Sequence, residues 1–207
     1  MKKLVMEFLG TFFLVLTVAV TGNPLAIASV LMAWTYIGGF VSGAHYNPAV
    51  SLAVGIRSGH EWIHIAYYTL AQVLGGIIAY ATTYYLHGSI HIPAPAVGLV
   101  QAFIVEILLA FVFTLVVLTV STAEVFKNNY VFGFAIGFTI PALVYLGTPI
   151  SGGLFNPAIA LGANLLGVIR GMPVMWSEVG MYVGGALIGG ALAAYAFDYF
   201  RLDSKRP

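Results

Sequence analysis

The sequence predicts an all-α membrane protein with six transmembrane helices and two half-helices, arranged as an inverted repeat. The first observation is its composition: of the 207 residues, 60% are hydrophobic and only 7% are charged. Soluble domains carry about 25% charged residues, so most of this surface is expected to face lipid. The second observation is the spacing of the apolar runs, and the third is a duplicated Asn-Pro-Ala motif.

Six apolar runs have lengths close to the roughly 20 residues that cross a hydrocarbon core of about 30 Å. They cover residues 4–20, 25–41, 62–86, 99–120, 130–146 and 176–200, with a loop predicted at 87–98 and a turn at 123–129. Two shorter apolar runs, 48–56 and 157–168, each follow an Asn-Pro pair. At about 1.5 Å per residue, such runs reach only about half of the bilayer, so we predict half-helices there.

The duplicated motif has the pattern Ser-Gly-x-x-x-Asn-Pro-Ala and occurs at 42–49 and at 151–158. A single Asn-Pro pair commonly opens a turn or a helix and carries little information. Two copies with the same spacing, each opening a short apolar run, indicate a repeated functional element. The motif residues are Asn47, Pro48, Ala49, Asn156, Pro157 and Ala158.

The two halves of the chain repeat one another beyond this motif. Glu7 begins a Glu-x-Leu pattern in the first span, and Glu106 begins the same pattern in the fourth. Each half, 1–88 and 99–200, contains three full spans and one half-span. Because three is odd, the second copy must enter the membrane from the opposite face. In such inverted repeats, functional sites lie near the midplane, where the interrupted segments meet.

The basic residues predict the orientation in the membrane. With six spans the two termini share one side, and most basic residues fall there. We therefore expect a multi-pass protein with both termini cytoplasmic. Short termini and the absence of targeting signals favour a prokaryotic plasma membrane. The residues on that side are Lys2, Lys3, Arg57, Lys127, Arg201, Lys205 and Arg206, with only Arg170 opposite.

The half-helices suggest a chemistry for the midplane. Irregular backbone at membrane depth is tolerated only where it lines water or is buried in protein. Two half-helices that enter from opposite faces bring together N-termini that each carry about half a positive charge, which repels cations. Asn47 and Asn156 can cap these ends and donate amide hydrogens to a passing water, which interrupts a proton wire. The alternative is that both Asn-Pro pairs are only helix caps in a buried loop. The backbone expected to line the track belongs to Gly43, Ala44, His45, Gly152 and Leu154.

With these motifs, the chain resembles the aquaporin, or major intrinsic protein, family over essentially its whole length. Thr11 after Glu7, and the pair Ala71 and Gln72, support the resemblance. The resemblance implies a right-handed aquaporin-like bundle and a single transmembrane channel domain over 1–207. It further implies a homotetramer in the lipid bilayer, with one pore per subunit that passes water or small neutral solutes and excludes protons.

In one place the chain departs from the family pattern. The family's narrowest point is formed by four residues, one of them usually an Arg directly after the second Asn-Pro-Ala. By the family's spacings, these four residues are here Ile27, Val144, Gly153 and Ile159. Losing a guanidinium removes five hydrogen-bond donors and a fixed charge. We therefore expect a wide, apolar filter that admits glycerol, urea, ammonia, hydrogen peroxide or neutral metalloid acids besides water.

An alternative for this filter is that a neighbouring side chain restores the constriction. The candidates are Tyr46, Phe155 and Phe138.

The ionisable residues allow two interpretations each. Glu7 and Glu106 lie inside spans, where such groups mark function by default. They could relay protons, but we favour a structural role as acceptors for the loop backbone of the half-spans. His45 could gate the pore with pH, although a plain lining role is favoured. His87 and His91 could in principle bind a metal, but a solvated loop is favoured.

Several functional classes are excluded by the composition. Cysteine is absent, which rules out disulfides and thiolate metal sites. The net charge of +1 and the lack of a basic patch give no reason to expect nucleic acid as a partner. We expect no cofactor, no metal site and no enzymatic activity. Two other functions remain as alternatives to a channel: a coupled secondary transporter of a small solute, and a structural membrane protein with a closed pore.

Overall fold

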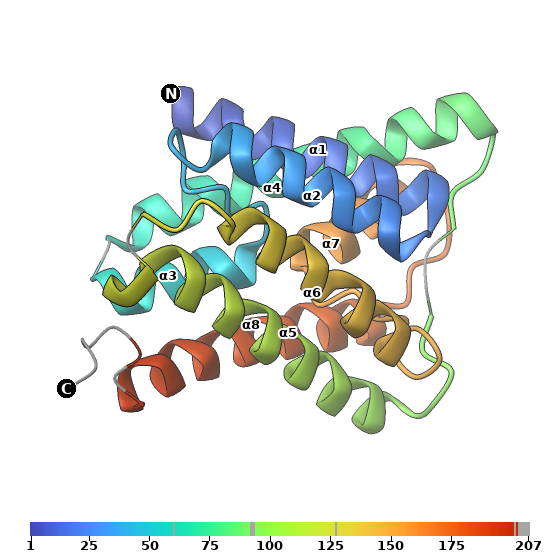
Figure 1. Cartoon of the computed structure of the whole chain (residues 1–207). Helices are drawn as coiled ribbons and strands as arrows, with labels where there is room; N and C mark the ends of the chain where they lie inside the picture. Colours follow the sequence, from blue (N-terminus) through green and yellow to red (C-terminus); the bar gives the residue numbers. More distant parts are fainter. Residues whose placement is uncertain (60, 92–93, 127, 201, 203–207) are drawn as a thin grey trace.

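The computed structural model describes residues 1–59, 61–91, 94–126, 128–200 and 202. Within these residues the chain forms helices joined by turns and loops, packed as a single bundle (Figure 1). The helices are α1 (Lys2–Thr21), α2 (Pro24–Gly38), α3 (Pro48–Ser58), α4 (Trp62–His87), α5 (Leu99–Thr122), the 3-10 turn η1 (Glu124–Phe126), α6 (Phe132–Gly147), α7 (Pro157–Ile169) and α8 (Trp176–Tyr199).

The predicted all-α membrane bundle is confirmed, although two spans are shorter than expected. Among the described residues, α1, α4, α5 and α8 are long and apolar enough to cross a membrane. The helices α2 and α6 have only 15 and 16 residues, and each is followed by a turn. The predicted end of the second span at residue 41 is therefore wrong. The N–H groups of Val41 and Ser42 share the carbonyl of Gly38, which turns the chain toward the first motif.

Within each half, two long helices cross at a glycine, and the two glycines occupy matching positions. A Cβ atom on Gly75 of α4 would lie 2.6 Å from the carbonyl oxygen of Phe8 in α1, and one on Gly189 of α8 would lie 2.3 Å from that of Ile107 in α5. These distances are too short for any side chain. The backbones of α1 and α4, and of α5 and α8, can pack this closely only because glycine is present.

The next glycine of each pair holds the half-helix of the opposite half. A Cβ on Gly76 would lie 2.4 Å from the carbonyl oxygen of Ala158 in α7, and one on Gly190 would lie 2.6 Å from that of Ala49 in α3. The long helix of each half therefore packs against the Asn-Pro-Ala motif of the other half. This exchange places α3 and α7 in the interior of the bundle, pointing in opposite directions along it (Figure 1).

The N-terminus and the end of α8 lie at the same end of the bundle (Figure 1). Arg57, at the end of α3, lies there too, because its Nε is 3.9 Å from a carboxylate oxygen of Asp198 in α8. Arg170 follows α7 at the other end, where it donates to the hydroxyl of Tyr84. The other residues counted for orientation, Lys127, Arg201, Lys205 and Arg206, lie outside the described residues.

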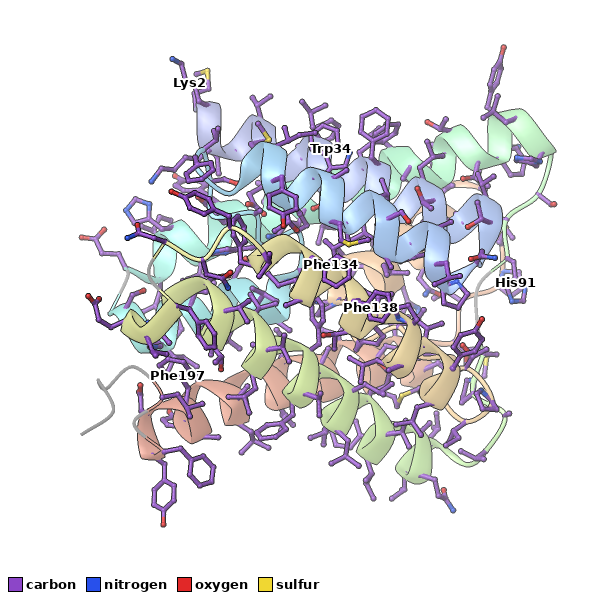
Figure 2. The ribbon with its side chains drawn as sticks, viewed as in Figure 1. Lys2, Trp34, His91, Phe134, Phe138 and Phe197 are labelled. Carbon is purple, nitrogen blue, oxygen red and sulfur yellow. The ribbon has the colours of Figure 1, made fainter. Side chains whose placement is uncertain are left out.

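The outer surface of the bundle is apolar. Phe134 and Phe138 of α6 are 55% and 59% exposed and stack on one another with ring centroids 5.3 Å apart (Figure 2). Comparable exposed apolar side chains lie along each of the other long helices. A surface of this kind, far larger than the apolar patches of soluble monomers, is typical of a protein embedded in lipid.

The glycine crossings lead to a stability prediction. We expect Gly190→Ala to lower the free energy of unfolding by about 1–3 kcal/mol, because the added methyl group overlaps the carbonyl of Ala49. The matched control is Gly180→Ala on the same helix, where nothing lies within 4 Å of the added Cβ. Thermal unfolding in detergent, followed by tryptophan fluorescence, would measure both. Equal midpoints for the two variants would contradict the close crossing.

Candidate pore

Both short helices begin with the same cap. The side-chain oxygen of Asn47 accepts from the N–H of Ala49 at 2.8 Å, and that of Asn156 accepts from the N–H of Ala158 at 3.0 Å. The proline that follows each Asn needs no acceptor, since it has no N–H, and its fixed φ suits the first helical position. The sequence therefore starts each helix at a defined residue, and the Asn amide nitrogen faces away from its own helix.

The amide nitrogens join the two motifs to each other. Asn47 Nδ2 donates to the carbonyl oxygen of Phe155 at 3.0 Å, and Asn156 Nδ2 donates to the carbonyl oxygen of Tyr46 at 3.0 Å. Each Asn thus binds the residue just before the other Asn. The two helix N-termini are held head to head, and each amide keeps a second hydrogen that it can donate to a molecule beside it.

The loop before α3 is fixed by Glu7 of α1. One carboxylate oxygen accepts from the hydroxyl of Ser42 at 2.6 Å and from the N–H of His45 at 3.0 Å. The other accepts from the N–H of Tyr46 and from the side-chain amide of Gln72, both at 2.8 Å. Glu7 is fully buried, and these hydrogen bonds compensate for its removal from water.

Glu106 of α5 does the same for the loop before α7. It accepts from the hydroxyl of Ser151 at 2.6 Å, from the N–H of Leu154 at 3.1 Å and from the N–H of Phe155 at 2.6 Å. Like Glu7, it is fully buried. The carboxylates of α1 and α5 therefore occupy equivalent positions in the two halves, as acceptors for backbone that forms no helix.

The residue before each Asn has an unusual backbone conformation. Tyr46 has φ of 49° and Phe155 has φ of 29°, in the left-handed region that costs a residue with a side chain about 1–2 kcal/mol. Both are held from two sides, since a glutamate binds the N–H and the opposite asparagine binds the carbonyl. The conformation is therefore imposed by these four contacts, and it turns the chain sharply into the half-helix.

A cavity of about 630 Å³ lies on one side of the paired motifs. Its lining contains both asparagines, Asn47 and Asn156, and no Lys, Arg, Asp or Glu among the described residues. We call it the outer cavity, because its far end reaches Thr21, the last residue of α1, and His91, which lies at the end of the bundle away from Lys2 (Figure 2). The four residues predicted to form the filter all line it: Ile27, Val144, Gly153 and Ile159.

A second cavity, of about 690 Å³, lies on the other side and is lined by Lys3, Ser42, Ser51 and Tyr68, among others. We call it the inner cavity. His45 lines both cavities and therefore lies at their junction. Its ring is positioned by a 3.1 Å hydrogen bond between Nδ1 and the hydroxyl of Ser51, and by packing against the ring of Tyr68.

The remaining predicted backbone positions divide into two groups. Gly152 and Leu154 line the outer cavity. Gly43 and Ala44 do not appear in the described lining of either cavity. Of the three positions predicted in the first loop, His45 is the one in the described lining.

The three side chains considered as substitutes for the missing constriction behave differently. Phe138 points away from the bundle and stacks on Phe134 (Figure 2). The ring of Tyr46 lies against Gly10, and its hydroxyl donates to the carbonyl of Trp34. Phe155 lines the outer cavity and packs on Phe113 with ring centroids 5.6 Å apart. Tyr46 also lines the outer cavity, but its ring and hydroxyl are held by these contacts, whereas Phe155 lies on the cavity wall with only the Phe113 ring beside its own.

Sequence reasoning missed several residues of this site. The hydroxyls of Tyr68 and Tyr182 donate to the carbonyls of Ser42 and Ser151, which fixes the two loops in the same way. The internal repeat could have revealed these two tyrosines. Tyr68 lies seven residues before Gly75, and Tyr182 lies seven residues before Gly189, at matching places in the two halves. Tyr80, which lines the outer cavity from α4, has no such counterpart.

Comparisons with known proteins agree with this arrangement. A family model described as Major intrinsic protein matches residues 20–197. The chain is 31% identical over 223 residues to an aquaporin of Oryza sativa, NIP1-4, in an alignment that covers 100% of this chain and 79% of the relative. It is 30% identical over 212 residues to a glycerol uptake facilitator protein-like protein of Lactiplantibacillus plantarum, covering 94% and 96% of the two chains.

A solved structure has the same fold. The aquaglyceroporin of Plasmodium falciparum superposes with a TM-score of 0.82 over 95% of both chains, at 21% sequence identity. The bundle, with two short helices meeting between two cavities, defines an integral membrane protein of the channel class. The chain belongs to the major intrinsic protein family, whose members are passive channels and not enzymes.

The buried carboxylates lead to a second prediction. We expect Glu106→Gln to lower the free energy of unfolding by about 2–4 kcal/mol, because an amide NH₂ would replace one of the two oxygens that accept from the N–H groups of Leu154 and Phe155. Thermal unfolding of the detergent-solubilised protein would measure the change. The control is Glu61→Gln, whose side chain is 80% exposed. A midpoint as high as that of the control would show that the loop before α7 does not depend on this carboxylate.

Proposed function

We propose that this chain is a passive channel for water and small neutral solutes, with a wide and apolar outer filter. The solutes include glycerol, urea, ammonia, hydrogen peroxide and neutral metalloid acids. The filter consists of Ile27, Val144, Gly153 and Ile159. Protons are excluded at the paired motifs, where Asn47 and Asn156 hold two helix N-termini together.

The observation that carries this proposal is the lining of the outer cavity. Its described lining has no charged side chain, and the position after the second Asn-Pro-Ala carries Ile159. A neutral solute loses little by entering such a space, whereas an ion loses its hydration and finds no opposite charge. The names of two relatives, an aquaporin and a glycerol uptake facilitator, fit a pore for water and small polyols.

The exclusion of protons rests on the two asparagines. A water between them would accept a hydrogen bond from each free amide hydrogen, and both of its lone pairs would be occupied. It could not then accept a proton from its neighbour, so the proton wire is interrupted. The positive ends of α3 and α7 add an electrostatic barrier to any cation.

A coupled transporter fits the structure less well. Coupling requires a midplane group that is free to bind an ion or a proton. The two acids considered for this role are Glu7 and Glu106. Their carboxylate oxygens already accept hydrogen bonds from the backbone of the loops before α3 and α7. A closed pore fits less well too, because substantial cavities reach the motifs from both sides.

The proposal extends to the assembly and its placement. We infer a homotetramer in a prokaryotic plasma membrane, with both termini in the cytoplasm. The matched contacts of Glu7 with Glu106, and of Gly76 with Gly190, support inverted repeats at 1–88 and 99–200 within one channel domain.

A filter variant tests the proposed solute range. We expect Ile159→Arg to reduce glycerol and urea permeability about tenfold or more while water permeability changes far less, because a guanidinium narrows the cavity and adds donors that hold water. Stopped-flow light scattering on proteoliposomes would measure all three permeabilities. The control is Ile169→Arg, on the same helix but 71% exposed. A wild type that passes water and excludes glycerol and urea would contradict the wide filter.

A charge change at the motifs tests cation exclusion. We expect the double variant Asn47→Asp and Asn156→Asp to pass a measurable monovalent cation current, because two carboxylates would offset the positive helix ends. Voltage clamp of cells with the protein confirmed at the surface would detect it. Asn23→Asp is the control, since Asn23 caps α2 before Pro24 in the same way but is exposed. If the double variant passes no cation current, the barrier to cations does not depend on these two asparagines.

A further inference from the structure

Tyr80 of α4 is a polar side chain of the outer cavity that the motifs do not explain. Its relative exposure is 0%, and it packs in one cluster with Val15, Leu154 and Ile159. It also lines the outer cavity. Tyr80 lies one turn after Gly76, which contacts Ala158 of α7, so α4 presents it toward the first turn of α7.

The repeat shows that packing alone does not require a tyrosine here. The glycine pairs at 75–76 and 189–190 align α4 with α8, and residue 80 then corresponds to Ala194. Ala194 is also 0% exposed, in a cluster with Ala53, Leu118 and Phe197. Tyr80 lines the outer cavity together with Ile159, which stands where the family pattern usually has an arginine. The equivalent position in the second half of the chain holds only the methyl group of Ala194.

The hydroxyl of Tyr80 has no hydrogen-bond partner among the residues that the structure describes. The other interior tyrosines near the motifs each have one: Tyr46 donates to Trp34, Tyr68 to Ser42 and Tyr182 to Ser151. The Tyr80 oxygen is not among the fully buried side-chain atoms that lack a partner, which fits a hydroxyl that opens onto the cavity its side chain lines. There it can form a hydrogen bond with water or a solute.

We propose that Tyr80 is a specificity-determining residue of the outer filter, where its neutral hydroxyl takes over the hydrogen-bonding role that an arginine at position 159 would have. This inference rests on the proposed channel function. The solutes that it favours are uncharged molecules with hydroxyl or amide groups, such as polyols and urea.

The chemistry of a phenol explains this preference. Its hydroxyl donates one hydrogen bond and accepts others, whereas a guanidinium only donates and carries a positive charge. A polyol that enters an apolar filter leaves its hydration water behind and needs replacement partners of both kinds. Tyr80 provides them beside Ile159 and Leu154, at no cost in burying a charge.

The test is Tyr80→Phe, which removes one oxygen and keeps the ring that packs in the core. We expect glycerol and urea permeability to fall about fivefold, the effect of losing one hydrogen bond. We expect water permeability to change less than about twofold, because water molecules that pass in single file keep hydrogen bonds to one another. Stopped-flow measurements on proteoliposomes would give the ratio of glycerol to water permeability.

The matched control is Tyr85→Phe, which removes a hydroxyl from the same helix at a side chain that is 86% exposed. A wild type that passes glycerol, with the same glycerol-to-water ratio in both variants, would overturn the role of Tyr80 and leave the channel proposal standing. A wild type that passes only water, with slower water flux in Tyr80→Phe than in Tyr85→Phe, would overturn the solute range and support Tyr80 as a pore residue. A wild type impermeable to all three solutes would overturn both.

Discussion

Two reciprocal hydrogen bonds join the halves of this protein at its centre, and the arrangement of the pore depends on them. Asn47 donates to the carbonyl of Phe155, and Asn156 donates to the carbonyl of Tyr46. They hold two helix N-termini face to face, although both ends carry partial positive charge and repel each other. The same amides retain one hydrogen each for the cavity. One contact pair therefore provides both the mechanical joint and the proposed selectivity against protons.

That joint requires the loops before α3 and α7 to remain in a strained conformation. Tyr46 and Phe155 have positive φ, which would relax in a free loop. Glu7 and Glu106 prevent this, since each carboxylate binds the N–H of the strained residue while the opposite asparagine binds its carbonyl. The glycines at 76 and 190 let α4 and α8 approach the half-helices closely enough to support them. The buried acids thus act on the pore through the backbone.

The sequence predicted most of the fold because the membrane allows few alternatives. Long apolar runs must become helices in lipid, and their bounds agree with the structure to within a few residues, except where α2 turns after Gly38. The motif was harder to interpret, because an Asn-Pro pair is not specific to the pore. Asn23 caps α2 at the surface in the same way as Asn47 caps α3 in the interior. Only the preceding Ser-Gly and the duplication distinguished a site from a plain cap.

The sequence by itself determined the helices and the repeated motifs, because composition, caps and spacing are local properties. The resemblance to the family added that Ile159 stands where an arginine is usual. Tertiary structure alone decided which atoms meet: that each asparagine binds the opposite loop, that His45 lies between two cavities, and that Tyr80 reaches the outer one. These contacts join residues up to 110 positions apart. They depend on how helices cross in three dimensions, which no local pattern specifies.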